Sequence, residues 1–165
     1  AVGGATTAEP ATTLAPTPTT LAPTPTTEHP GTAAVAAYHA SRAVYVEAAQ
    51  FPHPDHPGLA QTLTGPVLER VRDALDARRR SGRASRFPGP RDVRATDTGA
   101  RNDMVVLSVC YVDDGILYEK ATGRVVNDDV VTLYSEVLMA FEGGRWKEYD
   151  SVLRDEKPGR FPCAG

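Results

Sequence analysis

Apolar residues recur at helical spacing in two stretches of the first half of the chain, which predicts two amphipathic helices. The first covers about 33–50 after Thr32 as N-cap, and its apolar face consists of Val35, Tyr38, Tyr45, Val46 and Ala49. The second starts at Thr64-Gly65-Pro66 and stops at Ser81-Gly82, and its apolar face consists of Val67, Leu68, Val71, Ala74 and Leu75. A short helical stretch around 57–63 lies between them.

Beyond Pro90 the apolar period changes from helical to alternating, which predicts strands. The segment 104–112 is apolar at both its odd and its even positions, so we expect a central strand that is covered on both faces. The segment 92–98 is a weak edge strand, and two short strands follow at 116–120 and 124–126.

The last two predicted strands, 130–142 and 145–153, are joined by Gly143-Gly144, which is a strong hairpin signal. Pairing Phe141 with Trp146 gives a register in which one face carries Met139 opposite Glu148 and Val137 opposite Asp150. The other face carries Tyr134, Glu136, Leu138 and Tyr149. Helices followed by a curled antiparallel sheet predict an α+β domain.

The start of the chain differs in composition from the rest. Residues 1–30 contain ten Thr, six Pro and two copies of Thr-Thr-Leu-Ala-Pro-Thr-Pro, and they lack Lys and Arg. So few large apolar side chains do not offset an ordering cost of about 1–2 kcal/mol per residue. We therefore predict a disordered Thr/Pro-rich stalk or tether over 1–31 and a folded domain over 32–165. The stalk is either O-glycosylated outside the cell or a plain flexible tail.

Charge and hydropathy narrow the range of partners. The chain has a net charge of -3, and nine of its Arg lie between 69 and 94. Because aromatic residues hardly interleave with these Arg, a solvated helix face is favoured over a nucleic-acid site. Neither a membrane span nor a signal peptide is recognised. We expect the mature form of an exported protein; a lipid anchor upstream of this chain and a homodimer are left open.

The two Cys of the chain are Cys110, in the predicted central strand, and Cys163, in the tail. One disulfide between them would anchor the tail, and such a bond persists only in an oxidising compartment. This pairing predicts an extracellular or cell-surface location. The alternative is a buried free thiol at Cys110 and an unpaired Cys163.

Several short motifs follow one another in a fixed order, namely Thr64-Gly65-Pro66 with Leu68-Glu69-Arg70, Val109-Cys110-Tyr111-Val112-Asp113-Asp114, Ala121-Thr122-Gly123, Gly143-Gly144-Arg145-Trp146-Lys147 and Cys163. In this order they resemble the cone domain of the nuclear-transport-factor-2-like superfamily, also called cystatin-like. More narrowly, the chain is similar to secreted proteins and lipoproteins of actinobacteria with a Thr/Pro-rich N-terminal segment. The resemblance covers about 33–163 and implies helices packed on a strongly curved antiparallel sheet.

The superfamily includes ketosteroid isomerases, scytalone dehydratases and polyketide cyclases, which use a pocket between helices and sheet. The resemblance implies a carboxylate base in an apolar pocket and a hydrogen-bond donor. Asp150 is the candidate base and Tyr45 the candidate donor, and the candidate ligand-binding residues are Tyr38, Tyr45, Trp146 and Asp150. Glu136 is a further carboxylate within a strand. In the alternative interpretation, both carboxylates face solvent and the tyrosine rings belong to the core.

Two clusters have the residue types of metal ligands but fit simpler interpretations. His53-Pro54-Asp55-His56, with His39 nearby, reads as a rigid surface loop because of its Pro residues, and Asp113-Asp114 reads as a turn before Gly115. We predict no metal site and no cofactor.

These observations favour an exported, non-enzymatic binding domain of the cell envelope whose partner is a small apolar ligand or an envelope protein. The first alternative is an isomerase-like or cyclase-like enzyme that uses a pocket carboxylate. The second is a purely structural envelope protein whose cone is filled by its own side chains.

Overall fold

The first helix begins earlier than its apolar pattern predicts. The computed structural model describes residues 29–89 and 92–163, so almost all of the predicted stalk lies outside the described residues. Helix α1 spans Pro30–Gln50, and its N-cap is His29, whose side chain accepts a hydrogen bond from the Gly31 amide at 3.2 Å. The prediction of Thr32 as N-cap is wrong because Pro30 is already favourable in a first turn.

The next two helices follow the sequence prediction closely. Helix α2 spans Pro57–Thr62, and α3 spans Gly65–Arg80 with Thr64 as N-cap and Ser81 as C-cap. Gly65 has φ +57, and a Cβ at this position would lie 2.5 Å from the ring of Tyr149. Glycine is therefore required where the chain enters α3.

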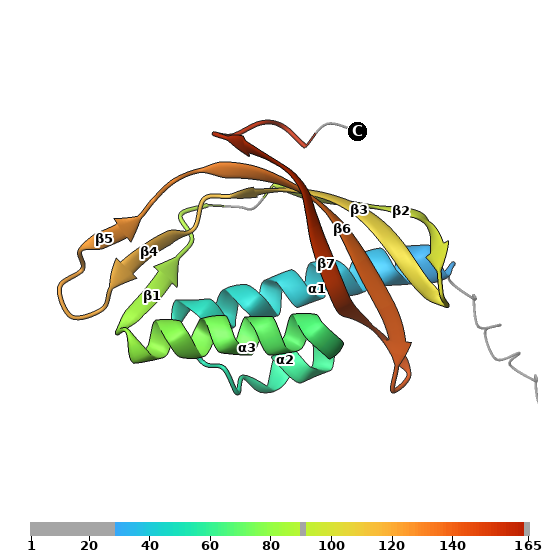
Figure 1. Cartoon of the computed structure of the whole chain (residues 1–165), viewed down its shortest axis with the longest axis horizontal. Coiled ribbons are helices and arrows are strands. Elements are labelled where there is room, and N and C mark those ends of the chain that lie inside the picture. The colour runs from blue at the N-terminus through green and yellow to red at the C-terminus, as the bar shows by residue number, and fades with distance from the viewer. Residues whose placement is uncertain (1–28, 90–91, 164–165) are drawn as a thin grey trace, which may run out of the picture.

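The described strands form two antiparallel sheets beside the three helices, which confirms the α+β class. The larger sheet has the order β2-β3-β6-β7, with β2 at Val93–Arg101, β3 at Met104–Asp113, β6 at Val131–Glu142 and β7 at Arg145–Pro158. The smaller has the order β1-β4-β5, with β1 at Arg83–Arg86, β4 at Ile116–Glu119 and β5 at Val125–Asn127. In Figure 1 the strands pass over the helices.

Two sheet features differ from the prediction of one curved sheet. The strands divide between two sheets, and β1 was not predicted because Arg83–Arg86 carries no apolar alternation. β2 is an edge strand and β3 is internal, as expected. The expected cover on both faces of β3 holds at Val106 and Val112, which are buried, but Ser108 is exposed.

The hairpin of β6 and β7 has the predicted register at its tip and a bulge further on. Phe141 pairs with Trp146 and Met139 pairs with Glu148, as predicted. The register then shifts by one residue, so that Asp150 pairs with Leu138 and not with Val137. A β-bulge adds one residue to one strand, and here the added residue is Tyr149, which no sequence pattern indicated.

The core consists of two clusters of buried side chains along α1. One joins the first half of α1 to the larger sheet and contains Ala34, Tyr38, Val105, Leu107, Val109, Val137 and Met139. The other joins the second half of α1 to α2 and α3 and contains Ala48, Ala49, Leu59, Leu63, Val67 and Leu75. Helix α1 therefore packs on the larger sheet with its first half and on α2 and α3 with its second half.

The C-terminal tail is fixed to the larger sheet. Cys163 forms a disulfide with Cys110 of β3, with a Cα–Cα distance of 5.6 Å, which confirms the predicted pairing. Arg160 forms an ion pair of 2.5 Å with Asp114, a buried carboxylate in the turn after β3. The disulfide indicates an oxidising compartment outside the cytoplasm.

Candidate functional site

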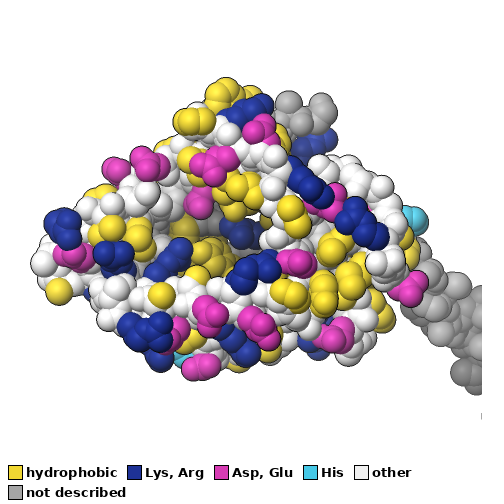
Figure 2. Space-filling view, viewed as in Figure 1, with side chains coloured by type: hydrophobic (Ala, Val, Ile, Leu, Met, Phe, Trp, Pro, Cys, Tyr) yellow, Lys and Arg dark blue, Asp and Glu magenta, His cyan; other side chains and the backbone are white. Residues whose placement is uncertain are grey.

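A cavity of about 220 Å³ opens between α1, α3 and β7. We call it the Arg42 cavity; it is lined by Ser41, Arg42 and Tyr45 of α1, Leu63, Val67, Arg70, Val71 and Ala74 of the α3 side, and Glu148 and Ser151 of β7. Figure 2 shows this side of the molecule hollowed between the strands and the helices, with basic and apolar side chains around the hollow. The cavity thus combines an apolar wall with charged groups.

Helical spacing and the bulge bring these residues to one place. Val67, Arg70, Val71 and Ala74 recur at three- and four-residue intervals and therefore share one face of α3. On β7, residues three apart point to opposite faces of a regular strand. The extra residue Tyr149 changes this parity, so that both Glu148 and Ser151 line the cavity.

Glu148 is the buried carboxyl group of the cavity, with 7 % of the residue exposed. Its Oε2 lies 2.9 Å from the hydroxyl oxygen of Ser41, which also lies 2.8 Å from the carbonyl oxygen of Tyr38. Removal from water disfavours the charged form of a carboxyl group. Burial raises the pKa of Glu148, although the nearby Arg42 acts in the opposite direction.

Arg42 lies against aromatic rings, and within residues 29–89 and 92–163 it forms no ion pair with a carboxylate. Its guanidinium lies 4.6 Å from the ring centroid of Tyr111 and 5.1 Å from that of Tyr45. Burial acts to lower the pKa of Arg42, but the surrounding tyrosines and Glu148 outweigh it and raise that pKa, so the group stays charged. Its buried Nε has no hydrogen-bond partner within the described part of the chain.

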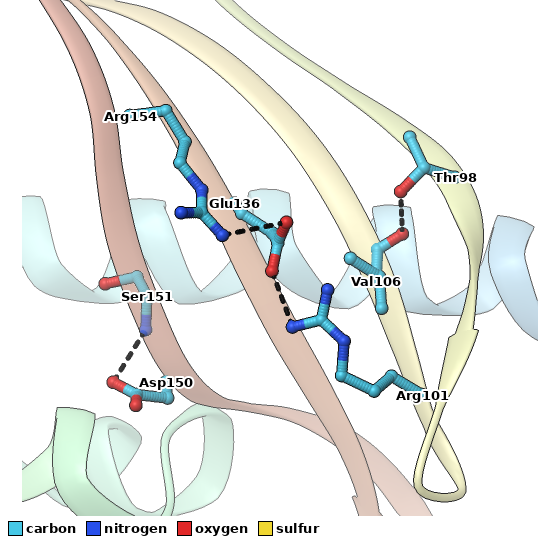
Figure 3. A network of polar contacts seen from close by, with 7 residues as sticks. All are labelled: Thr98, Arg101, Val106, Glu136, Asp150, Ser151 and Arg154. Carbon is cyan, nitrogen blue, oxygen red and sulfur yellow. Dashed lines mark hydrogen bonds and ion pairs between the residues drawn. The ribbon is translucent and has the colours of Figure 1, made fainter.

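The predicted base, Asp150, lies beside the cavity in an ion pair. Its Oδ1 accepts hydrogen bonds from Arg70 at 2.6 Å and from the Ser151 amide at 2.8 Å (the latter in Figure 3). The hydrogen bond from Arg70 lowers the pKa of Asp150, and 30 % of the side chain is exposed. The predicted donor, Tyr45, lines the cavity, and its hydroxyl accepts a hydrogen bond from Arg78 at 3.2 Å.

The other two candidate ligand-binding residues lie elsewhere. Tyr38 is 2 % exposed and belongs to the core between α1 and the larger sheet. Trp146 packs edge-on against Phe141 at the tip of the β6–β7 hairpin, with 5.3 Å between ring centroids. The structure therefore brings Tyr45 and Asp150 to the cavity region and leaves Tyr38 and Trp146 outside the cavity lining.

Sequence reasoning did not select the two most informative residues of the cavity. Glu148 carried a signal, because the predicted register placed it opposite the apolar Met139. Arg42 carried none, since an Arg within an Ala-rich helix reads as a solvated residue. Among its aromatic contacts, Tyr111 on β3 is the one that is distant in sequence, so the inward orientation of this Arg is not visible in a local pattern.

Glu136, the other predicted strand carboxylate, belongs to a separate ionic cluster. It accepts a hydrogen bond from Arg101 at 2.8 Å and forms an ion pair with Arg154 at 3.2 Å (Figure 3). The hydrogen bond from Arg101 lowers the pKa of Glu136. A carboxylate paired with two exposed Arg is a surface feature and not a base in an apolar pocket.

The His-containing loop after α1 forms no recognisable metal site in the described ranges. The rings of His53 and His56 meet edge-on with 5.8 Å between centroids. Among residues 29–89 and 92–163, no three His, Cys, Asp or Glu side chains gather as metal ligands. No helix in the same ranges has the length and apolarity of a membrane-crossing segment.

Fold and cavity together define an extracytoplasmic α+β domain with a cavity between its helices and its larger sheet. No protein-family model and no curated protein matches the chain. The fold is similar to the crystal structure of the intermembrane space region of the chloroplast protein ARC6, with a TM-score of 0.54 and 14 % sequence identity. The match covers 76 % of this chain and 96 % of that chain. At this identity the likeness shows a common fold alone.

Proposed function

We propose that this protein is a non-enzymatic binding domain outside the cytoplasm whose Arg42 cavity takes a small ligand. The observation that carries the proposal is the cavity itself, in which Leu63, Val67 and Val71 form an apolar wall beside the charged Arg42. Small-molecule sites are typically concave and mostly apolar, with a few polar groups that orient the ligand. A ligand with a hydrocarbon body and one polar end fits this arrangement.

Two observations support binding over the alternatives. A general base in an apolar pocket needs a raised pKa, whereas the hydrogen bond from Arg70 lowers the pKa of Asp150. The hydroxyl of Tyr45 accepts from Arg78 and keeps its own proton to donate, so the ion pair of Asp150 is what disfavours the enzyme alternative. The open cavity of about 220 Å³ leaves room for a ligand between the helices and β7, which supports binding over a purely structural role.

The cell-surface address and the superfamily are part of the same proposal. The disulfide of Cys110 and Cys163 supports an exported protein, and the Thr/Pro-rich start of the chain supports a tether to the envelope. The order of three helices followed by antiparallel strands supports membership of the nuclear-transport-factor-2-like superfamily, in the secreted actinobacterial group.

Native mass spectrometry of the full chain, purified from its own host, tests the proposal. We expect a non-covalently bound small molecule on the wild type. Ala74→Phe places a ring in the cavity lining, whereas Ala77→Phe places the same ring on another exposed position of α3. We expect Ala74→Phe to reduce occupancy and Ala77→Phe to keep it. The absence of any bound molecule, or equal occupancy in the two variants, would contradict a ligand-binding cavity.

A further inference from the structure

The contact between Ser41 and Glu148 bears on whether this carboxyl group is protonated. Its oxygen lies within hydrogen-bond distance of two acceptors, at 2.8 Å from the Tyr38 carbonyl and 2.9 Å from Oε2 of Glu148. A hydroxyl has one proton to donate, and a carbonyl oxygen can only accept. Ser41 either donates to an ionised Glu148, which lowers the pKa of that carboxyl group, or donates to the Tyr38 carbonyl and accepts from a protonated Glu148, the state in which both contacts are hydrogen bonds. The burial of Glu148 favours the second of these, the neutral state.

A neutral Glu148 leaves the Arg42 cavity with an excess positive charge. Arg70 and Asp150 neutralise one another through their ion pair of 2.6 Å. Among the described residues Arg42 forms no ion pair with Glu148, and a guanidinium stays protonated in proteins; its aromatic neighbours do not neutralise this charge. One uncompensated guanidinium therefore lies at the cavity, and a ligand that binds there gains most when it carries one negative charge.

The geometry around Arg42 suits a carboxylate that carries an apolar body. The rings of Tyr45 and Tyr111 lie against the guanidinium, and Arg42 lines the cavity. The edge of a guanidinium presents paired N–H donors that match the two oxygens of a carboxylate. The apolar wall of Leu63, Val67 and Val71 then contacts the hydrocarbon part of the ligand.

Cavity size sets the length of the ligand. A volume of about 220 Å³ corresponds to roughly seven water-sized groups at about 30 Å³ each. We propose that the Arg42 cavity binds a small aliphatic monocarboxylate, an inference that rests on the proposed binding function. The carboxylate lies at Arg42, the hydrocarbon body lies on the apolar wall, and a neutral Glu148 lies beside the ligand. Pentanoate has seven non-hydrogen atoms, and pentanamide has the same size and shape without the charge.

Isothermal titration of the full chain with these two probes at pH 6 tests the ligand class. Charge-assisted hydrogen bonds favour pentanoate over pentanamide by roughly tenfold to a hundredfold. Arg42→Gln should remove this preference, Arg42→Lys should keep part of it, and Arg80→Gln, on the exposed end of α3, should keep all of it. Circular dichroism of each variant checks that the fold is intact.

The protonation of Glu148 has its own test. Glu148→Gln imitates the neutral group and should bind pentanoate as tightly as the wild type does where Glu148 is protonated. As the pH rises, we expect wild-type affinity to fall, because an ionised Glu148 repels the ligand, and Glu148→Gln affinity to change less than twofold. The other ionisable groups that face Glu148 are unchanged in this variant: Arg42, Tyr38 and Tyr45 on α1, Arg70 on α3, Tyr111 on β3 and Asp150 on β7.

Each failure has a separate meaning. Equal binding of pentanoate and pentanamide would overturn the carboxylate inference and leave the binding domain in place. The same pH dependence in the wild type and in Glu148→Gln would overturn the neutral Glu148. If neither probe binds at millimolar concentration, the carboxylate inference fails. The proposed binding function is then decided separately, by native mass spectrometry of protein purified from its own host.

Discussion

Loss of the disulfide should destabilise the protein strongly while its native structure persists. The bond links residues separated by 53 positions, from Cys110 in β3 to Cys163 in the tail. In the chain-entropy model, opening a loop of this length costs about 4 kcal/mol at 25 °C. Typical domains are stable by about 5–15 kcal/mol, so the double variant Cys110→Ala/Cys163→Ala keeps only part of the wild-type stability.

Non-covalent contacts should hold the tail in place in this double variant. Thr132 Oγ1 donates a hydrogen bond to the Gly159 carbonyl and accepts one from the Phe161 amide, both at 2.9 Å. Arg160 remains paired with Asp114. The free energy is therefore lost mainly through the larger entropy of the unfolded chain, and we expect the native near-ultraviolet circular dichroism signal to change little.

Urea unfolding of the oxidised wild type and the double variant measures the effect. The control is Thr132→Val with the disulfide intact, which removes both tail hydrogen bonds of the side chain and should cost about 1–2 kcal/mol. If the double variant loses less than the control does, the loop-entropy argument is refuted for this protein. Two titratable thiols in untreated wild-type protein would refute the bond itself.

Three further substitutions test the core, the helix start and the cavity. Leu75→Ala should lower the free energy of unfolding by about 2–5 kcal/mol, because Leu75 is fully buried. The control Phe51→Ala, at a residue that is 75 % exposed, should change it by less than about 0.5 kcal/mol, and urea unfolding measures both variants. Gly65→Ala should cost about 1–3 kcal/mol in the same assay, since φ is +57 and the new Cβ meets the Tyr149 ring, and a neutral effect would contradict that contact. Burial raises the pKa of Glu148, so this residue contributes favourably to the free energy of unfolding at low pH, and the contribution is lost as the pH rises above about 4 through the native pKa. In unfolding curves from pH 4 to 8, Glu148→Gln should therefore gain stability relative to the wild type. A constant difference between the two proteins would contradict the raised pKa.

Local signals in the sequence were sufficient for the elements that local chemistry determines. Thr64-Gly65-Pro66 gave the start of α3, because Pro66 cannot extend a preceding helix and Gly65 adopts the required positive φ. Gly143-Gly144 gave the β6–β7 turn, with positive φ at both residues. The pair of Cys110 and Cys163 was also predictable, because the chain contains no other Cys.

The remaining features depend on contacts between distant segments. Arg83–Arg86 becomes a strand because its backbone pairs with β4, and not because its side chains favour a sheet. Arg42 faces inward because Tyr111 of β3 lies against its guanidinium. Neither partner is adjacent in sequence, so neither outcome follows from a pattern of polar and apolar residues.

The bulge at Tyr149 determines which carboxyl group enters the apolar cavity. Glu148 and Asp150 are two residues apart and would share one face of a regular strand. With the extra residue, Glu148 lies opposite Met139 and is buried, while Asp150 moves to the neighbouring register position and meets Arg70. Burial raises the pKa of the first and the ion pair lowers that of the second. The change of Asp150 from the predicted base to an ion-paired residue beside the cavity follows from this one added residue.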